Sequence, residues 1–422
     1  MKIGVCKKCI STTLPIHLTG FGNPDRKFTG IHDDIFTSAI AFESNGTFAI
    51  IVTADVLGFD AAKAKNCAKL ISEKTKVPAD SILFNASHTH SAPQTSENVN
   101  PGIGAYLKEY ADFFYDSAVK AAVGAFEDLE QGELSYTTGE CYGIGINRRN
   151  IETGTYYFAP YEKGIRNDEV TLLKAVCKGK LKALFFQYTC HPSTTGFDEI
   201  SGDYPAAAKR HLESAFPGTT ALFLQGCCGN IRVRTINDAG NGFRGGTYED
   251  VEHFGKLLAN KVIELESMPG NSVSGKLISK KTNFKIQYQS LLPKDEYKKK
   301  ADEQTLELYK NPLMKYYTEY ETISPDVGYS VQRIDIGDSF TLFGLEGEVC
   351  VEYDYAIKAM LPGRHTIVAG YSNGTPGYIC TADMYDYGGY EPSGSCCCYY
   401  AREGFKPETE QLILSEIKEN LL

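Results

Sequence analysis

The segment Ser81-Ile-Leu-Phe-Asn-Ala-Ser-His-Thr-His-Ser91 runs from an apolar stretch directly into two histidines. A short apolar run bounded by polar residues is typical of a buried β-strand that ends in a loop. In an extended backbone the side chains of residues i and i+2 point to the same face, so His88 and His90 are expected to lie side by side. Two imidazoles at the mouth of a strand suit a divalent metal, although a pair of polar loop histidines without a ligand gives the same pattern.

Apolar runs that end in polar or glycine-rich turns recur along the chain. They predict further strands at residues 48–54, 181–189, 220–224 and 339–343. Helical periodicity lies between several of them, at residues 61–75, 106–129 and 249–267. Strands that alternate with helices favour an α/β fold with mixed sheets covered by helices, and ligands in such folds sit at the carboxyl ends of strands.

The chain shows no internal boundary. No linker, low-complexity segment or internal repeat divides its 422 residues, so we expect one large catalytic domain over 1–422. Residues 293–322 are rich in Lys, Glu and Tyr and predict an exposed helical insertion. A solvated helix is the preferred interpretation of this insertion, and a lid over the site is the alternative.

Composition excludes several classes of partner. The net charge of −10 and the pI near 5.4 argue against nucleic acid or an anionic membrane surface. No run is long enough to span a bilayer, and charges at the N-terminus interrupt the apolar core that a signal peptide needs. We therefore expect a cytoplasmic protein that acts on a small-molecule substrate, without membrane insertion; composition does not specify the oligomeric state.

The cysteines also favour a reducing compartment. The chain has 13 of them, an odd number, and the adjacent runs Cys227-Cys228 and Cys396-Cys397-Cys398 suit disulfide pairing poorly. Cys6-Lys-Lys-Cys9 is a single CxxC motif without the second pair that a zinc knuckle requires.

Short motifs spread over most of the chain occur together in one known family. From about Gly20 to Tyr399 the chain resembles the catalytic domain of neutral ceramidases, zinc amidases that cleave N-acylsphingosine. The motifs are Gly20-Phe-Gly-Asn-Pro-Asp25, Gly30-Ile-His32, Ser87-His-Thr-His-Ser-Ala-Pro93, Ile146-Asn-Arg148, His191-Pro192 with Ser201-Gly-Asp203, Gly347-Glu348 and Gly377-Tyr378. The resemblance implies the fold of the ceramidase N-terminal domain, without the family's immunoglobulin-like C-terminal domain.

The resemblance also implies a zinc site. Carried over by position, the zinc ligands fall on His88, His191, Glu348 and Tyr378. Two neutral imidazoles and a carboxylate leave Zn²⁺ room for a water, and a tyrosine oxygen can bind weakly. Glu346 remains an alternative to Glu348 as the carboxylate ligand.

Further family positions carry the remaining chemistry. His90 corresponds to a residue that supports the metal or transfers protons. Arg148, with Arg149 as the alternative, corresponds to an arginine that binds an oxyanion, and Tyr390 to a tyrosine that donates a hydrogen bond to substrate.

One position departs from the family. The reacting serine of ceramidases corresponds to Arg232, in Phe223-Leu-Gln-Gly-Cys-Cys-Gly-Asn-Ile-Arg232. A guanidinium stays protonated and cannot act as a nucleophile, but it can bind an anionic or polyhydroxylated substrate. We therefore expect a zinc-dependent hydrolase that uses metal-activated water on an amide or ester of a small polar substrate other than ceramide. The alternatives are a glycosidic or other non-acyl bond hydrolase on the same scaffold, and a non-catalytic zinc- or ligand-binding protein.

Overall fold

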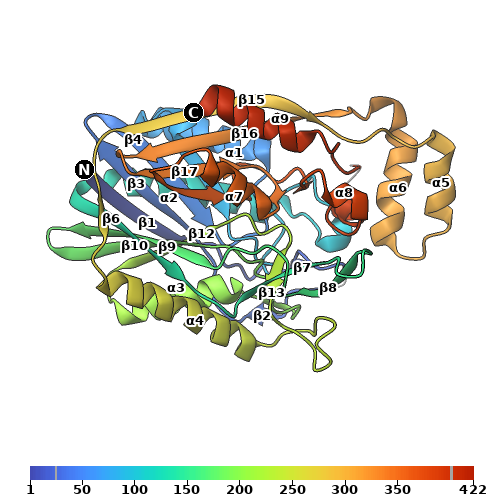
Figure 1. Ribbon diagram of the computed structural model, residues 1–422, viewed down its shortest axis with the longest axis horizontal. Helices are drawn as coiled ribbons and strands as arrows, with labels where there is room; N and C mark the ends of the chain where they lie inside the picture. Colours follow the sequence, from blue (N-terminus) through green and yellow to red (C-terminus); the bar gives the residue numbers. More distant parts are fainter. Residues whose placement is uncertain (24–25, 400–402) are drawn as a thin grey trace.

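Two β-sheets form the centre of the computed structural model, which describes residues 1–23, 26–399 and 403–422 (Figure 1). The larger is nine-stranded, in the order β12 (Thr220–Gln225), β10 (Lys180–Tyr188), β9 (Glu169–Cys177), β6 (Glu130–Glu140), β1 (Lys2–Cys9), β3 (Phe36–Ser44), β4 (Thr47–Ala54) and β5 (Ile82–Ala86), with β14 (Asn271–Val273) paired to β6. The smaller has the order β15 (Leu277–Gln287), β16 (Asp326–Ile336), β17 (Phe340–Leu345) and β19 (His365–Ala369). Both sheets mix parallel and antiparallel pairs, as expected.

The alternation of side chains along the strands explains how the two sheets pack together. In β4, Ile51 belongs to an apolar cluster that also contains Leu342 of the smaller sheet. Its neighbours Ile50 and Val52 point to the opposite face and join a second cluster with the helices. Because both faces of this strand are covered, its sequence reads as an almost continuous apolar run.

Helices cover the outer faces of both sheets. The cluster on the outer face of the larger sheet includes residues of α1 (Ala61–Thr75), α2 (Lys108–Glu127), α3 (Asp203–Ala215) and α4 (Tyr248–Ser267). The smaller sheet is covered by α7 (Glu352–Ala359), α9 (Thr409–Glu416) and the terminal turn Ile417–Leu421. The order of layers is therefore helix, sheet, sheet, helix, which confirms the predicted α/β class with covered mixed sheets.

Three small sheets lie outside this core and position the candidate site. They are β13 (Ile231–Val233) with β7 (Gly145–Asn150) and β8 (Tyr157–Tyr161), β11 (Glu199–Ile200) with β2 (Gly30–Ile31), and β18 (Glu348–Val349) with β20 (Tyr378–Ile379). The remaining short elements are α8 (Met384–Tyr387) and the 3₁₀ turns Ala79–Ser81, Pro101–Ile103, Tyr320–Thr322 and Gly394–Cys398.

The predicted insertion at 293–322 is helical. It forms α5 (Lys294–Asp302) and α6 (Glu307–Glu319), which project from one end of the body in Figure 1. Its inner side is nevertheless anchored, because Asn100 donates a hydrogen bond to the Leu308 carbonyl at 2.8 Å and Tyr297 donates one to Glu403 at 2.8 Å. None of the helices described is long and apolar enough to cross a membrane, and all 13 cysteines are free thiols.

The two edge strands of the larger sheet approach each other. Asn85 of β5 accepts a hydrogen bond from the Gln225 backbone of β12 at 2.9 Å and donates one to the Gly370 carbonyl at 2.8 Å. These bonds bring together the carboxyl ends of β5 and β12 and the segment after β19, and the loops that follow them meet at one place.

Candidate metal centre and its pocket

Three histidines converge at this meeting point. His88 and His90 follow β5, and His191 follows β10. Each offers a ring nitrogen, and the three nitrogens lie within 4.8 Å of one another. The ring centroids of His88 and His90 are 4.9 Å apart, as are those of His88 and His191. We call these three residues the imidazole cluster.

His88 and His90 lie side by side, but strand alternation is not the reason. The strand β5 ends at Ala86, and His88 has a left-handed backbone with φ of 68°. The His88 amide then donates to the Val56 carbonyl at 3.0 Å. A non-glycine residue in this conformation is unfavourable, so the surrounding contacts must hold it there. The expectation of an extended backbone at this point was therefore wrong.

Backbone carbonyls fix how two of the rings are protonated. The Nδ1 atom of His88 lies 2.6 Å from the Leu57 carbonyl, and that of His191 lies 2.6 Å from the Cys228 carbonyl. A carbonyl oxygen accepts only, so each Nδ1 carries the proton. In the neutral ring the lone pair is then on Nε2, which is the arrangement found in histidines that bind metals.

A buried carboxylate faces both of these lone pairs. Oε2 of Glu348 lies 3.2 Å from Nε2 of His88 and 3.0 Å from Nε2 of His191. The hydroxyl of Tyr371 donates to Oε2 at 3.3 Å, and the hydroxyl of Tyr399 donates to Oε1. Burial opposes ionisation of Glu348, but the two histidines outweigh it and hold the pKa of its carboxyl well below the usual range.

These contacts fit a bound cation. Two nitrogen lone pairs and a carboxylate oxygen repel one another unless a proton or a metal ion lies between them. Burial, followed by the positive charge of Arg148, lowers the pKa of His191 to about 4, which disfavours a proton at neutral pH. In addition, both ring nitrogens of His90 are buried without a hydrogen-bond partner among the described residues. The imidazole cluster and Glu348 therefore form a donor set that could hold a metal ion.

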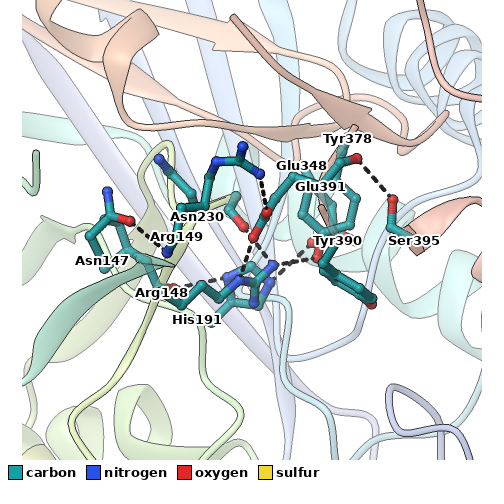
Figure 2. Close-up of polar contacts among 12 residues, drawn as sticks. Asn147, Arg148, Arg149, His191, Asn230, Glu348, Tyr378, Tyr390, Glu391 and Ser395 are labelled. Atoms are coloured by element: carbon teal, nitrogen blue, oxygen red, sulfur yellow. Dashed lines mark hydrogen bonds and ion pairs between the residues drawn. The ribbon is translucent and has the colours of Figure 1, made fainter. Parts of the chain in front are cut away.

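Tyr378 is placed beside Glu348 by the backbone. The two residues are direct partners in the parallel pairing of β18 with β20. The Tyr378 hydroxyl accepts a hydrogen bond from Nη2 of Arg148 at 3.0 Å (Figure 2). Its own hydrogen is therefore free for another acceptor in the pocket.

Arg148 and Arg149 both pair with the carboxylate of Glu391, but their other contacts differ. Nε of Arg148 donates to Oε1 of Glu391 at 2.8 Å, and Nη1 of Arg149 donates to Oε2 at 2.7 Å (Figure 2). Only Arg148 also reaches Tyr378, whereas Arg149 donates to the carbonyls of Met384 and Gly388. We call Arg148 and Arg149 the arginine pair; of the two, Arg148 faces the candidate site.

Arg232 lies close to the imidazole cluster. It is on β13, opposite Ile146 of β7, and forms a backbone bridge with His191. Its positive charge contributes to the lowered pKa of His90, although burial is the main cause. The carbon centre of its guanidinium lies 5.8 Å from the Phe158 ring and 4.9 Å from the Phe243 ring.

Aromatic side chains complete a narrow pocket. The Tyr390 ring packs edge-on against Tyr378 at 5.6 Å and beneath the guanidinium of Arg148 at 5.3 Å. The cavity has a volume of about 30 Å³, the space of roughly one water molecule. Its lining includes His88, His90, Glu348, Tyr378, Tyr390 and Tyr399.

Glu346, the alternative ligand, lies elsewhere. Its carboxylate accepts a hydrogen bond from Ser330, and its side chain lines separate cavities near Lys281 and Asp60. Burial raises the pKa of Glu346 to about 7. The structure thus brings Glu348, and not Glu346, to the histidines.

Sequence reasoning missed three residues that complete the site. Tyr371 and Tyr399 donate to Glu348, and Glu391 joins the arginine pair. The two tyrosines are among 27 in the chain, and no local pattern marks them. Glu391 directly follows Tyr390, and a glutamate in an otherwise uncharged segment was the only available signal. Of the motifs used for the resemblance, Pro24 and Asp25 lie outside the described residues.

Comparison with known proteins identifies the fold and the family. The family model for neutral/alkaline non-lysosomal ceramidase, N-terminal, matches residues 2–226, a range that contains His88, Arg148 and His191. The neutral ceramidase from Pseudomonas aeruginosa has a similar fold, with a TM-score of 0.78 and 21% identity over 98% of this chain and 72% of that one. A ceramidase complexed with C2 gives a TM-score of 0.79 and 19% identity over 98% of this chain and 73% of that one. The search of curated proteins gives no match.

The family match covers more than half of the chain, and the solved structures share the fold over nearly all of it. The chain therefore belongs to the neutral/alkaline non-lysosomal ceramidase family.

Proposed function

We propose that the chain is a zinc-dependent hydrolase that cleaves an amide or ester bond in a small polar substrate other than ceramide. One observation carries the proposal: Nε2 of His88 and Nε2 of His191 converge on one oxygen of Glu348 with their lone pairs directed inward. Tyr378 is proposed as a fourth ligand, because its backbone pairs directly with Glu348.

The metal would supply two things. Zn²⁺ held by His88, His191, Glu348 and Tyr378 acts as a Lewis acid and lowers the pKa of water toward neutrality. Tyr371 and Tyr399 hold the Glu348 carboxylate by hydrogen bonds and thereby fix its orientation.

His90 is proposed to move the protons. Both ring nitrogens of His90 are buried without a hydrogen-bond partner among the described residues, so one of them is available to accept a proton. In the reaction, water adds to the carbonyl carbon and gives one proton to His90. When the bond from carbon to nitrogen or oxygen breaks, His90 returns this proton to the departing amine or alcohol. The products are a carboxylic acid and that amine or alcohol, so the atoms balance.

Arg148, Tyr378 and Tyr390 are proposed to orient the substrate. The guanidinium of Arg148 donates to the Tyr378 hydroxyl and lies against the Tyr390 ring. Its positive charge can stabilise the negative charge that develops on the carbonyl oxygen of the substrate. Tyr390 closes the apolar side of the pocket with its ring.

The serine position separates this chain from a ceramidase. Arg232 stands where the family resemblance places the reacting serine, and a guanidinium does not attack a carbonyl. We therefore expect negligible hydrolysis of a fluorescent ceramide dispersed in detergent. Turnover at about one per second or faster, an ordinary enzyme rate, would contradict this part of the proposal.

The test combines metal analysis with a panel of chromogenic amides, esters and glycosides. Protein purified without added metal is expected to contain one zinc per chain, and His191→Ala is expected to lose both metal and turnover. His253→Ala, at an exposed histidine on α4, is the matched control. Cleavage of glycosides alone would favour the non-acyl alternative, and metal without any turnover would favour a binding protein. Full metal retention in both His88→Ala and His191→Ala would refute the site.

A further inference from the structure

Arg232, which is partly exposed, differs from the buried arginines of the chain. Arg26 donates to the carbonyls of Thr19, His90 and Phe197, and Arg333 pairs with Asp335 at 2.9 Å. In the described part of the chain, no carboxylate, carbonyl or hydroxyl accepts a hydrogen bond from the Arg232 side chain. Its Nε–H is also shielded from solvent.

A guanidinium in this position is costly unless something neutralises it. Burial and the neighbouring charge of Arg148 lower the pKa of Arg232 to about 10, so the group is still protonated at neutral pH. Phe158 and Phe243 cover it with apolar rings and contribute cation–π attraction, but they accept no conventional hydrogen bond. A partly buried cation whose Nε–H is shielded from solvent is stabilised by an anionic or strongly accepting partner.

The two carboxylates described at the site are already engaged. Glu391, the acid that pairs with the neighbouring Arg148, has both oxygens engaged by the arginine pair. Glu348 is engaged by His88, His191 and two tyrosines. A partner for Arg232 must therefore come from outside the chain.

We propose that Arg232 binds an oxyanion, a carboxylate or phosphate, carried by the substrate next to the bond that is cleaved. The inference rests on the proposed hydrolase function and narrows its substrate to small acidic amides or esters. The backbone bridge between Arg232 and His191 places the guanidinium beside the imidazole cluster. The ring centroid of His191 lies 5.8 Å from that of His90, the proposed proton carrier.

Shape and charge both support an oxyanion. The guanidinium presents its donors in a planar fork that matches two oxygens of a carboxylate or phosphate. Arg148 adds a second positive charge nearby, since its guanidinium and that of Arg232 both approach the Phe158 ring, at 5.3 and 5.8 Å. A neutral acyl chain would match neither the planar hydrogen-bond donors of the Arg232 guanidinium nor its positive charge.

The first experiment measures anion binding without turnover. Phosphate and, separately, succinate are titrated into the metal-loaded wild type, Arg232→Met and Arg234→Met, with calorimetry and thermal melting as readouts. Arg234 is a matched control two residues away, because it pairs with the exposed Glu162. We expect Arg232→Met to weaken the binding of at least one anion by about tenfold or more, and Arg234→Met to leave it unchanged. Equal binding of both anions to all three proteins would overturn the proposal.

Folding is checked in the same samples. Arg232→Met breaks no hydrogen bond or ion pair of the described residues and loses only cation–π contacts, so its melting temperature without anion should stay within a few degrees of the wild type. A parallel variant, Arg232→Lys, keeps the charge but not the planar fork, and it should restore part of the anion affinity. If Arg232→Met proves unfolded, Arg232→Lys is compared with the wild type instead. Phosphate and succinate affinities that are the same in these two proteins would contradict recognition by the planar guanidinium.

The second experiment separates the two proposals. The kcat/KM of the wild type is compared for succinyl-p-nitroanilide and its neutral methyl ester, and for a matched phosphorylated and unphosphorylated ester pair. In at least one pair the acidic member should have the higher kcat/KM. Arg232→Met should lower the ratio of acidic to neutral kcat/KM in that pair by about tenfold or more. Cleavage of neutral and acidic members at the same rate overturns anion recognition but leaves the hydrolase intact. Arg232-dependent anion binding with no cleavage of any substrate upholds the anion site and counts against the hydrolase.

Discussion

The imidazole cluster and the arginine pair are both buried and polar, but their polar atoms are satisfied differently. Each oxygen of Glu391 receives a guanidinium, and the spare donors of Arg149 end on backbone carbonyls. In the imidazole cluster only the outward Nδ1 atoms of His88 and His191 are matched by carbonyls. The Nε2 atoms of His88 and His191 face the carboxylate of Glu348, which is itself an acceptor. The two ring nitrogens of His90 have no hydrogen-bond partner among the described residues.

This difference identifies which polar groups hold the fold and which await a ligand. A buried polar group with a protein partner contributes to structure, because leaving it unpaired costs free energy. A buried group whose only neighbours are of the same sign gains its partner from a metal or a substrate. By this criterion Glu391 and Arg149 are supports, Arg148 links them to the proposed site, and the imidazole cluster and Arg232 are the proposed binding groups.

The largest expected effect is on the imidazole cluster. Glu348→Gln keeps the volume of the side chain but removes the charge that faces both histidines, so we expect loss of the metal and a fall in kcat/KM of about 1,000-fold or more. Glu346→Gln, two residues earlier, is the control and should keep its metal. Elemental analysis measures the metal content of the two variants, and kinetics on the best substrate of the panel measure their kcat/KM. Full metal content in Glu348→Gln would show that the carboxylate serves the fold instead.

The next effect concerns the arginine pair. Glu391→Gln leaves two buried guanidinium groups without their anion, and removing one partner of a buried ion pair costs about 3–5 kcal/mol of unfolding free energy. Glu162→Gln breaks the exposed contact with Arg234 and should cost less than about 1 kcal/mol. Urea denaturation of the two variants gives the comparison. A cost below 1 kcal/mol for Glu391→Gln would mean that this carboxylate is not a structural support.

The smallest effect is a pH dependence at Glu346. Burial raises the pKa of its carboxyl to about 7 in the folded chain, above the usual 4.5. The unfolded chain loses this proton first as the pH rises, so the contribution to stability is complete below pH 4.5 and is lost between about 4.5 and 7. The wild type loses this contribution above pH 7, whereas Glu346→Gln does not, so the variant should be more stable than the wild type by roughly 3 kcal/mol at pH 8. Denaturation curves at pH 5 and 8 measure it; an equal difference at both values contradicts the assignment.

Local patterns predicted the elements well. The helix expected at residues 61–75 has those bounds in the structure, since Asp60 caps it by accepting from the amides of Ala62 and Lys63. The strand at residues 220–224 extends one residue further, to Gln225. These outcomes depend on residues that are neighbours in sequence.

The site was predictable only where a motif marked it. The His-x-His motif and His191-Pro192 could be found by comparison with a family, but Tyr371 and Tyr399 reach Glu348 through tertiary packing that no local pattern encodes. The closeness of His88 and His90 was foreseen for the wrong reason, because a left-handed turn replaces the extended strand. The choice between Arg148 and Arg149 likewise needed the position of Tyr378, which only Arg148 reaches.

The hydrogen bond from Tyr399 to Glu348 has a consequence for how the protein is made. The loops that build the centre come from positions as distant as Leu57 and Tyr399. Contacts between residues so far apart require the closure of long loops, and they form late in folding. A nascent chain that has left the ribosome only as far as α7 carries all three histidines and Glu348, yet lacks Tyr378 and Tyr399. Because the proposed metal centre is complete only when Tyr378 and Tyr399 are present, we expect metal uptake to follow completed synthesis and folding of the chain.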